Sequence, residues 1–288
     1  MLAIDRIADI AGEVMSRVSF VCRQRSVAAI GMARGNRVDA FWYRGRVNFG
    51  DLITPALLWK AGLSPVHADV EIASLVSTGS VLQVVPETFR GLIVGSGLIT
   101  DVSRRFPDAQ VLGVRGEMTR QLINASPSTV LGDPGLLGHL LINDRRPPTN
   151  ILGVIPHYVD KPDPRIASWM KRFGRDARLI DVEREPAAVI EDMSTCSYVI
   201  SSSLHGLICA DALGIPSAWM RLSERVIGGG FKFADYNSAL GSHHEPKSIS
   251  GDETLSLVLR WMREVPSSVP SVQASLRAMF QAIRARHK

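Results

Sequence analysis

One segment of the chain, residues 198–216, places serine and histidine side chains where a predicted strand gives way to a helix. Its sequence, YVISSSLHGLICADALGIP, runs from β-branched residues through Ser202, Ser203 and His205 to helically spaced apolar residues. We expect Ser203 at the helix N-cap and His205 in the first turn, where free backbone N–H groups and the helix dipole favour an anion. A histidine there can donate a hydrogen bond to phosphate or transfer a proton. The alternative is a structural hydrogen bond beside a capped helix.

A second segment, residues 44–62, leads basic and small residues into another predicted helix. Asn48 or Asp51 can cap this helix, and Gly50 lets its backbone approach a ligand closely because it has no Cβ. A carboxylate beside a ligand-facing helix start can act as a general base. Asp51 is therefore either a catalytic base or a capping residue.

A third group consists of residue types that commonly bind phosphate. Arg115 lies between a predicted strand and a predicted helix, where it is either a surface arginine or a cation at the edge of a cleft that grips phosphate or carboxylate. Ser96 and Gly97 belong to a glycine-rich stretch that resembles part of a phosphate-binding loop. The sequence contains neither GxGxxG nor GxxxxGK[ST], which argues against a conventional dinucleotide or Walker site.

Residues 228–236, GGGFKFADY, combine a glycine run with Lys232, Asp235 and aromatic side chains. Glycine runs of this kind are found at the hinges of mobile loops. We expect either a loop that closes over a substrate and brings Lys232 to it, or a surface turn before the last helices.

Short β-like runs alternate with helix-like runs along most of the chain, which is typical of α/β folds with parallel sheets. A break at residues 141–150, LINDRRPPTN, contains paired prolines that cannot continue a helix. We therefore predict two Rossmann-like domains, residues 1–147 and 148–288, with the last helices, 255–264 and 272–286, able to pack back on the first domain. The predicted strands are 38–43, 73–79, 91–97, 109–114, 128–133, 151–157, 178–182, 198–202 and 217–220, and the other predicted helices are 51–61, 116–124, 134–142, 164–173, 186–193 and 204–213.

Several of these predicted strands end in small or polar residues. Ligands of open α/β sheets bind outside the carboxyl ends of the strands, so a cleft between two facing sheets is the expected site. Asp133, His157, Ser202 and Ser96 lie at the ends of such strands, and Arg115 directly follows one. We therefore count them among the candidate substrate-binding residues.

The composition of the 288 residues limits the partners of the protein. Hydrophobic residues make up 45% of the chain, which fits a folded globular protein. A net charge of +5 favours anionic partners, but only 6% of the residues are aromatic and the basic residues are scattered, which argues against nucleic acid. No His, Cys, Asp and Glu cluster has the spacing of metal ligands, so we expect no metal. Cys22, Cys196 and Cys209 form no CxxC pair and fit core positions in a reducing cytoplasm.

No apolar run reaches the length of a membrane span. The first 21 residues have the spacing of an amphipathic helix and not of a signal peptide. Near the other end of the chain, an apolar stripe lies beside basic residues and either packs on the core or attaches the protein to the inner face of the cytoplasmic membrane. The stripe consists of Val272, Leu276, Met279, Phe280 and Ile283, and the basic residues are Arg277, Arg284, Arg286 and Lys288.

An ordered set of motifs between Asn48 and Tyr236 resembles the polysaccharide pyruvyl transferase family, especially the enzymes that pyruvylate xanthan- and succinoglycan-type exopolysaccharides. The resemblance implies a GT-B-like fold and a transferase that moves the pyruvyl group of phosphoenolpyruvate onto two hydroxyls of one sugar. The product would be a cyclic ketal with release of phosphate, on a polymeric or lipid-linked glycan acceptor and without a cofactor. The motifs are NFGD, STGSVL, VGSGLI, GVRGEMT, GDPGLL, IPHY, SSSLHGLICADALGIP and KFADY.

The resemblance also assigns roles to residues. It implies that His205 contacts the donor phosphate or shuttles a proton and that Asp51, beside Asn48 and Gly50, activates the acceptor. Many relatives have an arginine two places before the histidine, whereas this chain has Ser203. The cation that contacts the donor is then absent or comes from elsewhere. The candidates are Arg115, Arg221, Arg225 and Lys232.

Two other functions fit parts of the sequence. A GT-B glycosyltransferase that uses a nucleotide sugar would share the fold and the basic residues, although no platform for a base and no ribose contact is recognisable. A noncatalytic glycan-binding relative would fit Ser203 in the place of arginine.

Overall fold

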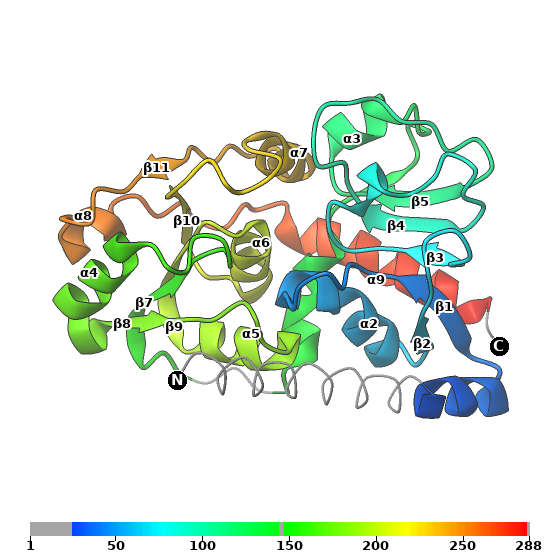
Figure 1. The fold of residues 1–288 in the computed structure, drawn as a ribbon, viewed down its shortest axis with the longest axis horizontal. Coiled ribbons are helices and arrows are strands. Elements are labelled where there is room, and N and C mark those ends of the chain that lie inside the picture. The colour runs from blue at the N-terminus through cyan, green and yellow to red at the C-terminus, as the bar shows by residue number, and fades with distance from the viewer. Residues whose placement is uncertain (1–24, 144–146, 287–288) are drawn as a thin grey trace, which may run out of the picture.

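The computed structural model describes residues 25–143 and 147–286, and within them two parallel sheets are flanked by helices (Figure 1). The first sheet has the strand order β2-β1-β3-β4-β5-β6 and the second β11-β10-β9-β7-β8. All neighbouring strands in both sheets pair in parallel. The predicted α/β class with two parallel sheets is therefore confirmed.

The strands of the first sheet precede those of the second along the chain. They are β1 (Arg37–Phe41), β2 (Ser64–His67), β3 (Leu75–Val76), β4 (Leu92–Ser96), β5 (Gln110–Val114) and β6 (Val130–Leu131), followed by β7 (Asn150–Ile155), β8 (Ala177–Leu179), β9 (Cys196–Ser201), β10 (Ser217–Arg221) and β11 (Lys247–Ser248). Residues 25–34 are helical, and the α-helices that follow are α2 (Phe49–Lys60), α3 (Glu117–Leu122), α4 (Pro164–Phe173), α5 (Pro186–Ser194), α6 (Leu204–Leu213), α7 (Phe231–Leu240), α8 (Leu255–Leu259) and α9 (Val269–Ala285). The 3₁₀ helices are η1 (Val81–Gln83), η2 (Pro134–Leu141) and η3 (Gly174–Asp176).

Each predicted strand and helix has a counterpart, with three differences. The predicted helix at 134–142 is the 3₁₀ helix η2, which begins at Pro134 after the N-cap Asp133. The strands β2 and β11 were not predicted, and β2 contains Pro65 at the edge of its sheet, a position where a strand tolerates proline. Residues 228–236, predicted as a closing loop or a surface turn, form a turn through Gly230 and then the first part of α7, which begins at Phe231.

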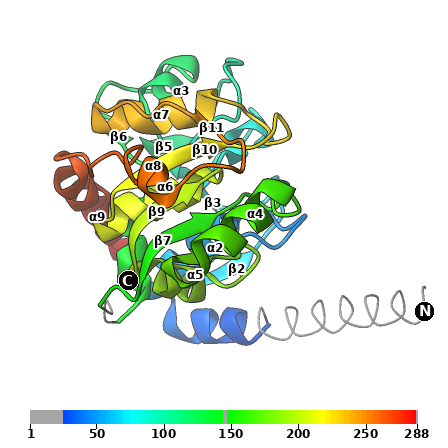
Figure 2. The ribbon, with the colours of Figure 1, turned by 90° about the vertical axis from the view of Figure 1, so that its left-hand side faces the viewer.

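The two sheets share a core. One cluster of buried apolar side chains joins Trp42 and Phe49 from the first part of the chain with Ile155 and Leu207 from the second. Figure 2 shows a further contact, in which α7 lies beside α3. The predicted domain boundary at residue 147 remains a prediction.

The helix α9 packs its apolar stripe on this core. Leu276, Met279, Phe280 and Ile283 are buried in the shared cluster, and Val272 packs against it. Of the two alternatives for this stripe, packing on the core is therefore the one observed, and the stripe is not available to a membrane. In the described part of the chain, no helix has both the length and the apolarity that crossing a membrane requires. The predicted amphipathic helix near the N-terminus, and Cys22, lie outside the described residues.

Candidate functional site

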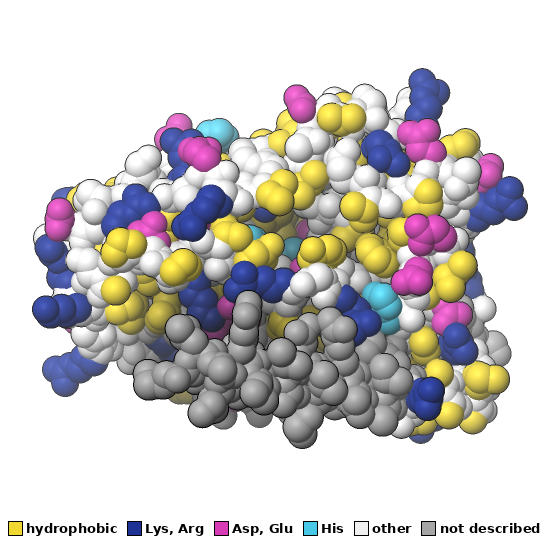
Figure 3. All heavy atoms as spheres, viewed as in Figure 1, with side chains coloured by type: hydrophobic (Ala, Val, Ile, Leu, Met, Phe, Trp, Pro, Cys, Tyr) yellow, Lys and Arg dark blue, Asp and Glu magenta, His cyan; other side chains and the backbone are white. Residues whose placement is uncertain are grey.

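The first residues of α2, α6 and α7 meet at a cavity of about 350 Å³. Figure 3 shows a recess in the middle of one face, with histidine side chains inside it and lysine or arginine side chains nearby. Three helix starts give the cavity partial positive charge from their backbone N–H groups. Six predicted site residues line this cavity: Asn48, Asp51, His157, Ser203, His205 and Lys232.

The start of α2 holds a carboxyl group at the cavity. Asn48 is the N-cap residue, and its Oδ1 accepts from the backbone N–H of Gly50 at 3.4 Å. Its Nδ2 donates to Oδ2 of Asp51 at 3.0 Å. Burial raises the pKa of Asp51 from 3.8 to about 6, although the Asn48 hydrogen bond and Lys232 oppose this shift. Asp51 can therefore change protonation state near neutral pH, as a general base must.

The start of α6 holds the predicted histidine. Ser203 is the N-cap residue, as predicted from the sequence, and His205 lies in the first turn with 8% of its surface exposed. Burial lowers the pKa of His205 to about 3, and the charges of Lys232 and Arg115 lower it further. The imidazole is therefore neutral at physiological pH. A Cβ on Gly50 would lie 2.0 Å from its Nδ1, so only glycine lets α2 approach the ring this closely.

Behind the ring of His205 lies a second carboxyl group. Nε2 of His205 is 3.9 Å from Oδ2 of Asp133, and both atoms are buried without a hydrogen-bond partner among the described residues. The other oxygen of Asp133 accepts from the Gly135 N–H at 2.8 Å. Burial raises the pKa of Asp133 to about 6. A small movement would let Nε2–H donate to Asp133, which would orient the ring and leave Nδ1 as its free acceptor.

The start of α7 brings an amine to the same cavity. Lys232 is 8% exposed, and no described residue forms a hydrogen bond or ion pair with its Nζ. Burial and then the charge of Arg115 lower its pKa to about 8, while Asp51 and Asp160 raise it. A buried, unpaired ammonium group at a helix start is suited to bind an anion. The three glycines before Phe231 predicted a closing loop or a surface turn around Lys232, whereas Lys232 lies in the first turn of a helix.

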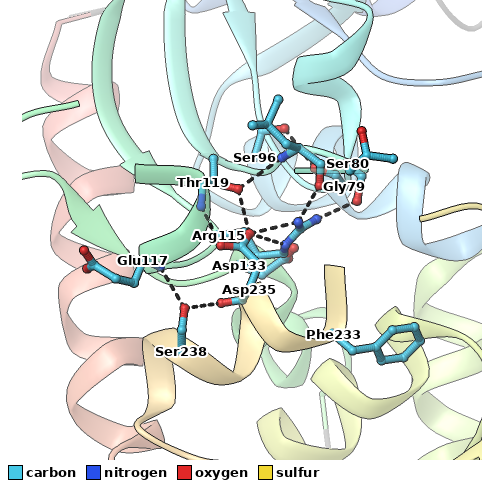
Figure 4. A network of polar contacts seen from close by, with 12 residues as sticks. Gly79, Ser80, Ser96, Arg115, Glu117, Thr119, Asp133, Phe233, Asp235 and Ser238 are labelled. Atoms are coloured by element: carbon cyan, nitrogen blue, oxygen red, sulfur yellow. Dashed lines mark hydrogen bonds and ion pairs between the residues drawn. The ribbon is translucent and has the colours of Figure 1, made fainter. Parts of the chain in front are cut away.

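Arg115 does not lie at the cleft edge, contrary to our expectation. Its side chain has no exposed surface and forms an ion pair of 2.8 Å with the equally buried Asp235 of α7. Its other hydrogen bonds go to Ser80 and to the carbonyl oxygen of Leu98 (Figure 4). Arg115 therefore does not contact a ligand in this conformation. It acts on the cavity through its charge and through Ser80, which lines the wall.

Gly97, Ser96 and Ser202 support the site from outside its walls. A Cβ on Gly97 would lie 2.4 Å from Cζ of Arg115, so this glycine makes room for the guanidinium. Ser96 is fully buried and donates to the carbonyl oxygen of Gly79 at 2.8 Å. Ser202 accepts from the N–H of His157 at 2.9 Å, which fixes the end of β7. None of the three lines this cavity, so none of them is placed to contact a ligand in it.

His157 and several residues that we did not predict complete the wall. Burial lowers the pKa of His157 to about 4, and its ring lies 4.1 Å from that of Tyr158. Arg225 also lines the cavity with a half-exposed side chain, 3.9 Å from Asp160. Of the four candidate cations for the donor, Lys232 and Arg225 lie here, whereas Arg221 lines a different cavity. Ten wall residues were not singled out from the sequence: Tyr43, Ser80, Val81, Gln83, Val84, Ile99, Tyr158, Val159, Leu204 and Ile227. Five of them lie in the quoted motifs, Ser80 and Val81 in STGSVL, Ile99 in VGSGLI, Tyr158 in IPHY and Leu204 in SSSLHGLICADALGIP, whereas the other five lie outside them.

Part of the chain that forms this site matches a known protein family. Residues 84–224 match the family described as polysaccharide pyruvyl transferase, so the resemblance predicted from the sequence is confirmed. The match includes Arg115, Asp133, His157 and Ser202–His205. Asn48, Asp51 and Lys232 lie outside it.

Two curated proteins are similar to the chain. The uncharacterized protein L143 of Acanthamoeba polyphaga mimivirus is 35% identical over 161 residues, which cover 52% of this chain and 55% of that protein. The succinoglycan biosynthesis protein ExoV of Rhizobium meliloti (strain 1021) is 25% identical over 225 residues, which cover 73% of this chain and 66% of that protein. The chain thus spans between about half and two thirds of the length of these relatives.

Among solved structures, the glycosyltransferase SnogD from Streptomyces nogalater is similar with a TM-score of 0.38 and 14% identity, covering 74% of this chain and 71% of that one. The assignment of the fold rests on the two parallel sheets described above and not on this likeness.

Proposed function

We propose that the protein transfers the pyruvyl group of phosphoenolpyruvate to a sugar, because residues 84–224 match the polysaccharide pyruvyl transferase family. The acceptor would be one sugar of an exopolysaccharide or of its lipid-linked precursor, which receives the group on two hydroxyls as a cyclic ketal. The observation that carries the proposal is the convergence of three helix starts, Lys232 and His205 on one cavity. Such a cavity suits a small ligand that bears both a phosphate and a carboxylate.

The proposed reaction needs acid–base groups and a stable anion site. C3 of the enol gains a proton while the first sugar hydroxyl loses its proton and attacks C2. The second hydroxyl then attacks the same carbon and loses its proton. The bond between C2 and the phosphate oxygen breaks, and phosphate leaves with the electron pair of that bond. Both steps can be catalysed by side chains that donate and accept protons, together with positive charge that stabilises the phosphate.

The residues of the cavity suit these steps. Lys232 and the first N–H groups of α6 and α7 would hold the phosphate and the carboxylate of the donor. Bound anions would raise the pKa of His205, which is neutral in the empty site, so its Nδ1 could take up a proton and then donate a hydrogen bond or that proton to the donor. Asp51, with its pKa near 6, would accept a proton from the attacking hydroxyl.

Lys232 is the best candidate to replace the arginine that relatives carry at the position of Ser203. It is the more buried of the two cations on the cavity wall, since Arg225 has a side chain that is 56% exposed and lies near Asp160. A buried ammonium interacts more strongly with an anion than an exposed guanidinium does, because less water screens it. We further propose that the enzyme works in the cytoplasm, at the inner face of the membrane if its acceptor is lipid-linked.

Calorimetry with phosphoenolpyruvate and with nucleotide sugars tests the donor. We expect phosphoenolpyruvate to bind and, with a suitable glycan, phosphate to be released while the glycan gains one pyruvyl ketal by mass spectrometry. Binding of a nucleotide sugar and not of phosphoenolpyruvate would favour a glycosyltransferase instead. Glycan binding without any phosphate release would favour a noncatalytic relative.

A further inference from the structure

A second cavity, of about 380 Å³, lies beside the first and has no role in the proposed donor site. A partition made of residues 159–160, 202–203, 224–227 and 232–233 separates the two. Neighbouring residues in each of these segments face opposite sides: Ser203 and Lys232 line the first cavity, while Ser202 and Phe233 line the second. A ligand in the second cavity would therefore be separated from the donor only by these single segments of the chain.

The second cavity has an aromatic wall. The rings of Trp219, from β10, and Phe233, from α7, are stacked with centroids 4.0 Å apart and planes at 11°. Both residues line the cavity. Figure 4 shows Phe233 extending from α7 away from the Arg115–Asp235 network. Flat aromatic surfaces in a cavity suit flat nucleobases or the C–H faces of pyranose rings, which are apolar although their edges carry hydroxyls.

The polar groups of this cavity favour a ligand that donates hydrogen bonds. Asp160 has no exposed surface; its Oδ1 accepts from Ser223 at 2.5 Å, while its Oδ2 is buried without a hydrogen-bond partner among the described residues. Ionised carboxylates only accept hydrogen bonds, so this oxygen lacks a donor.

A buried histidine adds a second acceptor. Nε2 of His244 lies 3.1 Å from the carbonyl oxygen of Ser217, which can only accept, so Nε2 carries the proton. Burial lowers the pKa of His244 to about 4, and the neutral ring leaves Nδ1 as an acceptor. Arg221 and His243 add exposed polar groups at the cavity.

We propose that the second cavity binds a neutral pyranose of the acceptor glycan, next to the sugar that receives the pyruvyl group. The pyranose would pack on Trp219, whose ring is backed by the buried Phe233, and donate hydroxyl protons to Asp160 and His244. Neutral sugars fit better than nucleotides because the unpaired groups are acceptors and one of them is a carboxylate, which repels phosphate. This inference rests on the proposed function for the identity of the glycan, but binding of a sugar can be measured without turnover.

Saturation-transfer NMR with the whole chain and millimolar methyl glycosides of glucose, galactose and mannose tests the cavity. We expect transfer to the ring C–H protons of at least one glycoside. Trp219→Ala should weaken that binding about tenfold, as expected for losing an aromatic contact. Because Trp219 is 9% exposed and its loss could unfold the protein, Ala234→Tyr provides a second variant. Ala234 is exposed on α7 at this cavity, so a tyrosine there would fill the space without removing a core contact.

The matched control is Trp59→Ala, at a tryptophan that is 50% exposed on α2 and lines neither cavity. It should leave glycoside binding unchanged, and all three variants should keep the wild-type affinity for phosphoenolpyruvate in calorimetry. The proposal is overturned if no glycoside shows transfer, if Ala234→Tyr binds glycosides like the wild type, or if uridine diphosphate competes for this cavity. Sugar binding that depends on Trp219 in a protein that does not bind phosphoenolpyruvate would keep this subsite and refute the proposed function.

Discussion

Arg115 and Asp235 form an ion pair of 2.8 Å in which neither side chain has any exposed surface, although 120 residues separate them in the sequence. Asp235 also accepts from the N–H and Oγ1 of Thr119 at 2.8 and 2.7 Å. A Cβ on Gly116 would lie 1.7 Å from the carbonyl oxygen of Asp235, so the backbones of α3 and α7 approach at this glycine. Because Lys232 lies one turn before Asp235 on α7, the pair fixes the position of Lys232 in the cavity.

Arg115→Met should therefore destabilise the protein by about 3–5 kcal/mol, because it leaves the carboxylate of Asp235 buried without its ion-pair partner. The double variant Arg115→Met/Asp235→Leu removes both charges and should recover much of this loss. Urea unfolding of the wild type, both single variants and the double variant measures the coupling. If Arg115→Met is as stable as the wild type but no longer binds phosphoenolpyruvate, Arg115 contacts the donor after all.

His205→Ala should fold like the wild type and lower turnover by about two to four orders of magnitude, as expected for the loss of an acid–base group. The distance of 3.9 Å between its Nε2 and Oδ2 of Asp133 adds a second expectation. Asp133→Asn should lower kcat more than it weakens donor binding, because it would disturb the orientation of the ring. Steady-state kinetics and donor calorimetry on both variants make the test, with His139→Ala, outside the cavity, as control. Wild-type turnover in His205→Ala would exclude the assigned role.

Asp51 should set the acidic limb of the pH profile. Its pKa of about 6 in the folded protein means that kcat/KM rises with pH through about 6, as the carboxylate loses its proton. Asp51→Asn should abolish this limb together with most of the activity. Asp133 also has a pKa near 6, so an acidic limb that survives in Asp51→Asn and is lost in Asp133→Asn would transfer the assignment to Asp133.

Asp51 should also make the free energy of unfolding depend on pH. Folding raises the pKa of Asp51 above the usual value of 3.8, so the contribution of this carboxyl group to stability is most favourable below pH 3.8 and is lost as pH rises through about 6. Relative to the wild type, Asp51→Asn should gain stability between pH 4 and pH 8. Urea unfolding at the two pH values measures this change. A constant difference between variant and wild type would show that the carboxyl group titrates normally.

The catalytic reaction should survive chelation. The described residues contain no group of three or more His, Cys, Asp or Glu side chains placed to hold a metal ion, and Lys232 and the helix starts supply positive charge to the cavity. Phosphate release should therefore be the same with and without EDTA. Loss of activity in EDTA that one divalent ion restores would contradict this expectation.

The residues that cap and begin helices could be predicted from local sequence signals. The burial of individual side chains could not, because it depends on contacts between residues that are distant in the sequence. Ser203 and His205 were placed correctly because a β-branched run, a capping serine and a helical apolar pattern lie next to one another. The burial of Arg115 could not be foreseen, because its partner Asp235 lies on a distant helix. The apolar stripe of α9 has the same pattern whether it faces a core or a membrane, and only the partner elements show that it is buried.

Lys232 should make the affinity for the donor fall at alkaline pH. Its pKa is lowered to about 8, mainly by burial, so the ammonium group is lost near that pH and the affinity for phosphoenolpyruvate should fall as pH rises through about 8. Lys232→Met should weaken binding by about 10- to 100-fold at pH 7, the range for a hydrogen bond to a charged group, and should remove the pH dependence. Lys232→Arg should keep binding at pH 9, because guanidinium stays charged.

Arg225→Met is the matched control for Lys232, because it removes the other, half-exposed cation of the same wall. Water and salt screen an exposed charge, so this variant should weaken binding less than Lys232→Met and should retain the fall in affinity near pH 8. Calorimetric titration of phosphoenolpyruvate into the four proteins at pH 7, 8 and 9 compares them. If Arg225→Met loses more affinity than Lys232→Met, then Arg225 is the cation that replaces the missing arginine.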